Sequence, residues 1–191
     1  MANATRQFFS FDEYVELEEM PRVKHEYLAG QVWAMSGGSP AHARVSANLT
    51  ALLNRALVGR PCSTFSADLR VRATKTGLGT HPDVSVICGK LELDPDDRKG
   101  HTATNPRVLV EVLSSSTEAY DRGEKLAHYQ TIDSLAEVVL VAHDRKQIEV
   151  VRREPDGSWS RLVAGAGGTA RLESLGVELP VDEIYRDPLA G

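Results

Sequence analysis

Three nearly uninterrupted apolar segments constrain the fold of this chain more than any other feature. They span residues 82–88, 106–113 and 136–142. A strand with one face in water alternates polar and apolar residues, so segments of this kind are predicted to be strands covered on both faces. A helical pattern between the second and third segments, ending near Thr131, indicates a crossover that joins two parallel strands. The chain therefore predicts an α/β fold with helices flanking a mixed β-sheet.

The residues before this region predict a helix, a hairpin and a second helix. Ser10 and Glu13 have the spacing of a capping box, and Pro21 is expected to end the short helix that they begin. Two short strands near residues 26–28 and 31–35 are predicted to form a hairpin. Ser39 and Pro40 are then expected to begin a helix that runs to about residue 58.

The remaining segments complete the predicted sheet. Residues 62–73 indicate one strand and residues 74–80 a turn, and residues 89–105 are expected to form a mobile surface loop. Residues 147–153 and 158–163 are predicted to form an antiparallel hairpin. No linker divides the 191 residues, so we expect a single domain spanning residues 1–191.

Charge and cysteine content narrow the function classes. The formal net charge of −5 excludes a basic field over the whole molecule, which counts mildly against DNA binding. Cys62 and Cys88 permit one disulfide, but the apolar residues before Cys88 favour a buried thiol. No segment has the apolar length of a signal peptide or a membrane span, so we expect a cytoplasmic protein without a membrane partner.

Two acidic residues stand out within the apolar strands. Asp83 is expected one residue into the first apolar strand, and Glu111 in the middle of the second. An ionised carboxylate among aliphatic side chains is costly unless a cation neutralises it. A structural ion pair with Arg or Lys would suffice for either acid alone. Two such acids on neighbouring strands instead favour a site for a divalent metal, either Mg²⁺ or Mn²⁺.

These acids carry a resemblance to a known family. Pro82-Asp83 followed by Glu111 looks like the signature of the PD-(D/E)XK nuclease superfamily, and the chain as a whole resembles its Uma-type family of restriction-endonuclease-like proteins. The segments that carry the resemblance cover residues 25–30, 35–42, 66–71, 81–84, 110–114 and 116–125, followed by Tyr129. The resemblance implies a restriction-endonuclease-like fold, with the N-terminal helix and hairpin added to it.

One residue departs from the superfamily pattern. The usual lysine two positions after the acid is replaced by Leu113. Lys125, on the predicted helix that follows, is the natural substitute, because the start of that helix can return toward the end of the strand that carries Glu111. The alternative for Lys125 is a solvated helix lysine.

The resemblance implies hydrolysis of phosphodiester bonds in DNA. Asp83 and Glu111 would hold the metal, Glu26 would complete the metal shell, and Lys125 would orient the attacking water or stabilise the developing charge. Asp68 is interpreted as a structural or supporting acid. A capping or solvent-facing position is favoured for both His42 and His81.

Two other function classes stay open. The absence of a lysine at position 113 and the acidic charge balance are compatible with a nuclease fold that serves as a binding or assembly module with weak catalysis. A hydrolase acting on a smaller phosphate ester is the third hypothesis, because fold alone does not separate these activities. DNA is the expected partner, and a homodimer would suit an enzyme that cuts both strands.

Overall fold

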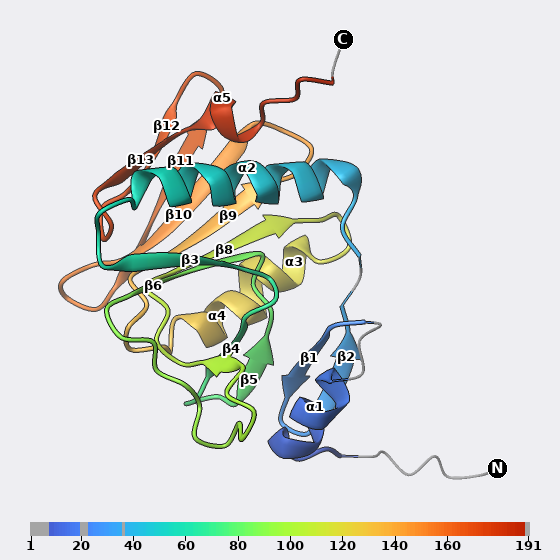
Figure 1. The fold of residues 1–191 in the computed structure, drawn as a ribbon. Coiled ribbons are helices and arrows are strands. Elements are labelled where there is room, and N and C mark those ends of the chain that lie inside the picture. Colours follow the sequence, from blue (N-terminus) through green and yellow to red (C-terminus); the bar gives the residue numbers. More distant parts are fainter. Residues whose placement is uncertain (1–7, 20–22, 36, 190–191) are drawn as a thin grey trace.

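The computed structural model describes residues 8–19, 23–35 and 37–189 (Figure 1). The helices are α1 Phe11–Glu18, α2 Pro40–Ala56, α3 Glu118–Tyr120, the π-helix η1 Asp121–Lys125, α4 Leu126–Tyr129 and α5 Val181–Ile184. The strands are β1 His25–Leu28, β2 Gln31–Ala34, β3 Cys62–Ser66, β4 Arg70–Ala73, β5 Leu78–Thr80, β6 Val84–Cys88, β7 Thr102–Ala103, β8 Val108–Leu113, β9 Glu137–Ala142, β10 Gln147–Arg153, β11 Trp159–Gly165, β12 Thr169–Leu172 and β13 Val177–Pro180.

A six-stranded mixed sheet forms the centre of the molecule. Its strand order is β11-β10-β9-β8-β6-β3, and β8 and β9 are its parallel pair. The crossover from β8 to β9 is the continuous helical stretch α3–η1–α4, as the apolar segments predicted. All six residues of β8 and of β9 are buried. The prediction of a mixed sheet with both faces covered is therefore confirmed.

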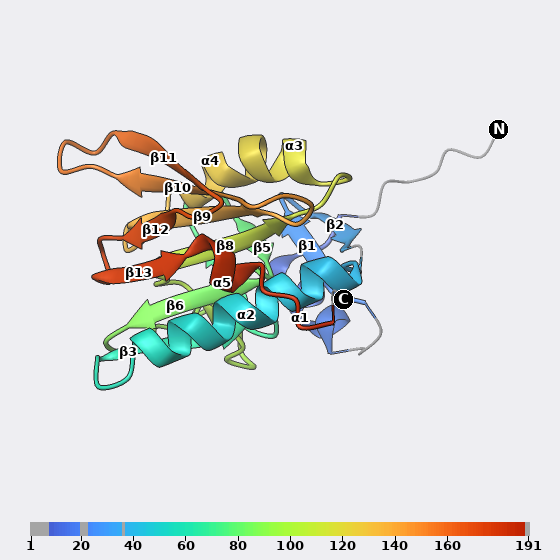
Figure 2. The same cartoon turned by 90° about the horizontal axis from the view of Figure 1, so that it is seen from above.

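The two faces of this sheet pack against different helices (Figure 2). On one face, alternate residues of β6, β8 and β9 join Val45, Leu49 and Leu53 of α2 in the largest core cluster, which also takes in β12, β13 and α5. On the other face, Leu109 and Leu113 of β8 pack against Leu126 and Tyr129 of α4.

The N-terminal strands β1 and β2 belong to a second, five-stranded sheet with the order β2-β1-β5-β4-β7. The capping box of α1 is present, with the Ser10 side chain accepting from the Glu13 backbone N–H. The β1–β2 hairpin forms as predicted, with Glu26 directly opposite Trp33. Ser39 caps α2, and Pro40 is its first residue. Pro21, expected to end α1, lies outside the described residues.

Several predicted boundaries are wrong. Residues 62–73 form two strands in different sheets, because a turn before β4 redirects the chain. Residues 74–80, expected to be a turn, also contain β5. Asp83 lies just before β6 rather than within it. The weakly apolar tail forms the β12–β13 hairpin and α5, which carry too short a pattern to be recognised from sequence.

The segment at residues 89–105 is not a simple surface loop. It contributes β7, which pairs in parallel with β4. Asp94 and Asp97 are buried and bind Arg72 and Arg70 at 3.0 Å and 3.5 Å. These buried ion pairs fasten the segment to the five-stranded sheet.

Cys62 and Cys88 form a disulfide, so the prediction of a buried thiol is wrong. The two residues are direct partners in the antiparallel β3–β6 pairing, with their Cα atoms 3.9 Å apart. Sequence separation alone does not reveal this register, because β3 and β6 meet only once the intervening β4–β5 excursion is folded.

No helix within the described part of the chain combines the length and hydrophobicity needed to cross a membrane.

Candidate active site

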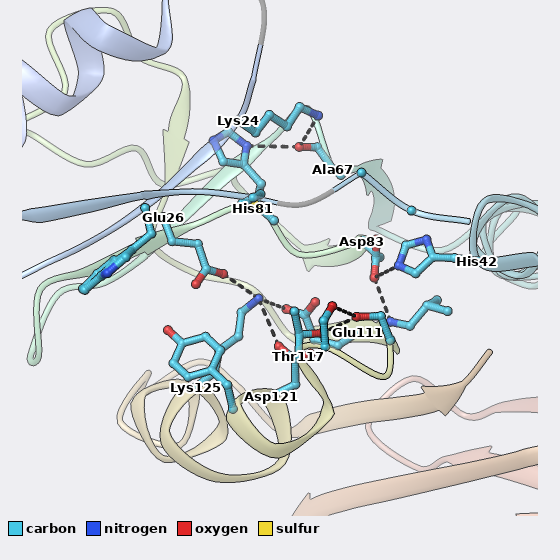
Figure 3. Close-up of a pocket in the computed structure, with 18 of the residues that line it drawn as sticks. Lys24, Glu26, His42, Ala67, His81, Asp83, Glu111, Thr117, Asp121 and Lys125 are labelled. Atoms are coloured by element: carbon cyan, nitrogen blue, oxygen red, sulfur yellow. Dashed lines mark hydrogen bonds and ion pairs between the residues drawn. The ribbon is translucent and has the colours of Figure 1, made fainter. Parts of the chain in front are cut away.

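The expected site residues gather around a cleft of about 580 Å³ (Figure 3). Its walls come from the β1–β2 hairpin, the start of α2, the segment before β6, the end of β8 and the α3–η1 helical stretch. Glu26, Asp83, Glu111 and Lys125 all line it. The structure thus brings together four residues that are distant in sequence.

Lys125 is the centre of a buried ion-pair cluster. Its Nζ lies 2.7 Å from Glu26 Oε1, 3.1 Å from Glu111 Oε1 and 3.6 Å from Asp121 Oδ1. Its side chain is only 3% exposed. Lys125 is therefore not a solvated helix lysine, and it reaches the strand acid that the superfamily signature places next to a lysine.

The π-helical segment η1 presents both Asp121 and Lys125 to the cleft side. Tyr129, one further turn along, donates its hydroxyl hydrogen to Glu111 Oε1. π-turns are rare and are frequent at functional sites. Sequence reasoning did not assign roles to Asp121 and Tyr129, although the four-residue spacing of Asp121, Lys125 and Tyr129 on one helix could have revealed them.

Burial and the charges of neighbouring groups shift the pKa values of the carboxyl groups around Lys125. Burial raises the pKa of Glu111 to about 8, even though the neighbouring Lys125 ammonium acts in the opposite direction. Burial likewise raises the pKa of Asp121. For Glu26, burial is outweighed by its ion pair with Lys125 and by hydrogen bonds, including one from Thr80, so its pKa lies below the ordinary value.

The lysine itself stays charged. Burial disfavours its ammonium, but the negative charges of Glu111 and its neighbours outweigh that effect and raise the pKa of Lys125 well above its usual value. One cation thus faces three carboxyl groups. Burial therefore favours the protonated form of Glu111 near neutral pH in the metal-free protein, and the charges of Asp83 and Asp121 act in the same direction.

Asp83 occupies the opposite wall of the cleft from Glu26. Its Oδ2 accepts a 2.7 Å hydrogen bond from the backbone N–H of Val112, the residue after Glu111. His42 Nε2, at the start of α2, lies 3.3 Å from the same oxygen. This hydrogen bond to Asp83 raises the pKa of His42, against the opposing effect of burial. The expectation of a capping or solvent-facing His42 is therefore wrong.

His81 belongs to a separate buried network. Its Nε2 lies 2.9 Å from Glu18 Oε2 and its Nδ1 lies 3.1 Å from the carbonyl oxygen of Ala67. The other carboxylate oxygen of Glu18 contacts His25 at 2.7 Å. His81 is buried rather than at the surface, and both ring nitrogens face acceptors. We therefore interpret it as a structural residue that joins α1 to the cleft wall.

Asp68 and Leu113 do not enter the cleft. Asp68 is largely exposed and pairs with Lys24 at 2.7 Å. Arg70, two residues after Asp68, is buried against Asp97. Leu113 lies in the core beneath α4, on the same face of β8 as Glu111.

The donor set determines what metal the cleft could hold. Within the described ranges, no group of three or more His, Cys, Asp or Glu side chains is arranged to hold one ion. Asp83 and Glu111 each receive hydrogen bonds on one oxygen from described residues, at Oδ2 and Oε1, which leaves Oδ1 and Oε2. Mg²⁺ is commonly bound by one or two carboxylates together with waters, so this pair fits Mg²⁺ and not a closed protein cage.

Glu26 has a different set of contacts. Its Oε1 binds Lys125 and also accepts a 2.6 Å hydrogen bond from Thr80. A role as third metal ligand stays a prediction, and the contacts favour Glu26 as the group that fixes the lysine.

Comparison with known proteins identifies the family of this chain. Residues 11–182 match the Uma2 family, which carries the description "Putative restriction endonuclease". The chain belongs to the Uma2 family. The resemblance found from the sequence motifs is therefore confirmed.

Relatives of this Uma2 protein are similar over nearly their whole length. An uncharacterised protein of Synechocystis sp. is 41% identical over 176 residues, covering 92% of this chain and 90% of the relative. A second uncharacterised Synechocystis protein is 30% identical over 173 residues, covering 91% and 96%.

A solved structure shares the fold. The crystal structure of a putative nuclease belonging to DUF820 from Anabaena variabilis aligns with a TM-score of 0.71 at 15% identity, covering 90% of this chain and 96% of that one. The predicted α/β fold class is thus confirmed.

Proposed function

We propose that this Uma2 protein is a metal-dependent endonuclease that hydrolyses phosphodiester bonds in DNA. The observation that carries the proposal is the position of the Lys125 ammonium, 3.1 Å from Glu111 in a cleft that Asp83 also lines. Membership of a family that carries the description "Putative restriction endonuclease" supports the same class of chemistry.

Asp83 and Glu111 would hold Mg²⁺ or Mn²⁺ through the oxygens that face the cleft. When bound, the metal supplies Lewis-acid stabilisation of the phosphate and lowers the pKa of a coordinated water. The backbone N–H of Val112 and the ring of His42 fix one side of the Asp83 carboxylate. Tyr129 fixes Glu111 in the same way.

Lys125 would act on the water and on the phosphate charge. Water adds its oxygen to phosphorus, one ester P–O bond breaks, and the leaving oxygen takes up a proton. A buried ammonium next to this path stabilises negative charge on the phosphate strongly, because the surroundings screen it little. Glu26 holds that ammonium in place at 2.7 Å, which makes Glu26 a positioning residue in this proposal.

Supercoiled plasmid DNA tests the proposal. We expect nicking in Mg²⁺, loss of nicking in EDTA, and at least a 100-fold lower rate for Asp83→Asn and for Lys125→Met, in line with the loss of one electrostatic group at a reacting centre. Asp133→Asn and Lys75→Ala are matched controls, because these two residues form an exposed ion pair with each other.

Calorimetric titration with Mg²⁺ separates metal binding from turnover. Binding by the wild type but not by Asp83→Asn would support the ligand assignment. A wild type that binds metal and DNA without cleaving any nucleic acid would instead identify a binding module. Full activity of Lys125→Met would remove the lysine from the mechanism.

A further inference from the structure

An exposed tryptophan stands at the mouth of the cleft. Trp33 lies on β2, the edge strand of the five-stranded sheet, and is 46% exposed. It lines the cleft together with Val23, Ala34 and Met35. Val23, which is 48% exposed, lines the same cleft, and exposed apolar patches often mark a binding site. Packing in the core does not account for the position of Trp33, because the residue is exposed.

The register of the hairpin fixes Trp33 next to the chemical centre. Glu26 and Trp33 are directly opposite residues of the antiparallel β1–β2 pair. Directly opposite residues project their side chains to the same face of a sheet. The indole therefore lies on the face that carries Glu26, whose carboxylate contacts Lys125 at 2.7 Å.

The charge of the cleft makes an aromatic contact useful. Four acids, Glu26, Asp83, Glu111 and Asp121, line the described part of the cleft, against the lysines Lys24 and Lys125. Most nucleic-acid binders gain affinity by neutralising phosphates with basic residues. This cleft, in a chain of net charge −5, has few cations to offer. An uncharged contact to the bases would therefore supply affinity that the backbone contacts do not.

On these grounds we propose that Trp33 is a stacking platform for an unpaired nucleobase of the strand whose phosphate enters the cleft. The proposal rests on the proposed function and specifies its substrate. A base can lie flat on the indole only after it has left the duplex stack. Single-stranded or locally unpaired nucleic acid is therefore the preferred substrate class, and stacking on an aromatic ring tolerates any base.

The two tryptophans of the chain allow a direct test. Trp159 lies on β11 outside the cleft, with the guanidinium of Arg153 4.9 Å from its ring centroid. A Trp159→Phe variant leaves Trp33 as the sole indole reporter. This variant is titrated in Ca²⁺, a cation that oxygen ligands bind, against a ten-nucleotide mixed-sequence single strand and against a blunt-ended duplex of two complementary strands. A gel confirms that the oligonucleotides stay intact.

We expect saturable quenching by the single strand and much weaker quenching by the duplex. Followed by anisotropy of a labelled strand, Trp33→Ala should weaken binding roughly 5- to 150-fold, the range for loss of one stacked base. Trp33→Tyr should restore most of the affinity, and Trp159→Phe should bind like the wild type. Because Trp33 is exposed, its variants are expected to fold like the wild type, and circular dichroism checks this.

Unchanged Trp33 emission during binding, or equal affinity of Trp33→Ala, would overturn the proposal. So would a sedimentation result in which the wild type is a dimer and Trp33→Ala a monomer, because the indole would then face a second copy. The two proposals fail separately. Plasmid cleavage that is insensitive to Trp33→Ala removes the platform alone, whereas Trp33 quenching without cleavage of any substrate removes the hydrolytic function and supports the platform.

Discussion

Replacement of Glu111 by glutamine should stabilise the metal-free protein while it abolishes metal binding. The pKa of Glu111 is raised from 4.5 to about 8, chiefly by burial. In the unfolded chain this carboxyl ionises as the pH passes 4.5, but in the folded protein it keeps its proton until about pH 8. Folding stability is therefore lost progressively as the pH rises between these two values.

The magnitude follows from that interval. At pH 7, which is about 2.5 units above the ordinary pKa of Glu111, ionisation of this carboxyl stabilises the unfolded chain. Each pH unit contributes about 1.4 kcal/mol, so the unfolding free energy of the wild type at pH 7 is about 3 kcal/mol lower than near pH 4.5. Glutamine does not ionise, and its side-chain oxygen can still accept from Tyr129 and Lys125. Glu111→Gln should therefore be about 3 kcal/mol more stable than the wild type at pH 7 and equally stable near pH 4.5.

Urea unfolding in EDTA, followed by far-ultraviolet circular dichroism from pH 4.5 to 8, measures this difference. Titrating groups outside the cluster affect both proteins equally, so the difference between the two curves reports Glu111 and the groups coupled to it. Glu178→Gln is the matched control, because Glu178 is exposed and forms its ion pair with the exposed Arg171 on β12. The reasoning would be refuted if Glu111→Gln were no more stable than the wild type at pH 8. A difference in unfolding free energy that does not change with pH would refute it as well.

Three further predictions address the metal, the lysine and the disulfide. Mg²⁺ binding at pH 7 should release close to one proton from Glu111, which calorimetry in buffers of different ionisation enthalpy detects; binding without proton release would contradict the assignment. Lys125→Met leaves Glu26, Glu111 and Asp121 without their shared cation and should lower the unfolding free energy by about 3 kcal/mol in urea, whereas Lys75→Met should change it little. Replacing both Cys62 and Cys88 by serine removes a disulfide between residues 26 positions apart and should lower the unfolding free energy by about 3 kcal/mol. The wild type in reductant is the comparison, and equal urea midpoints of variant and oxidised wild type would exclude a contribution from the disulfide.

The central sheet was predictable because its signal is local. Uninterrupted apolar residues at 108–110 and 138–142 need burial on both faces whatever the rest of the chain does. The same reasoning identified Glu111 and Asp83 as groups in need of a cation. By contrast, β3 and β4 form one continuous strand pattern in the sequence, and only tertiary pairing with β6 and β5 assigns them to different sheets.

The histidines show where residue-by-residue reasoning ends. His42 was expected to be a capping or solvent-facing residue, yet the approach of α2 to the end of β8 brings it to Asp83. His81 is engaged by Glu18, a residue 63 positions earlier in the chain. Neither contact produces a periodic pattern in the sequence, because each depends on how two distant elements pack. Such contacts require the assembled fold.

The exchange of the usual signature lysine for Leu113 has a geometric explanation in the helix that follows. Position 113 shares a face of β8 with Glu111, but that face continues beneath α4, where an apolar side chain packs against Leu126 and Tyr129. Lys125 ends the π-helical segment and Tyr129 follows one α-turn later. Both residues reach Glu111 Oε1, Lys125 at 3.1 Å and Tyr129 through its hydroxyl, while Asp121 contacts Lys125. The helix thereby supplies both the cation and the hydrogen-bond donor, while the strand position is left to the core.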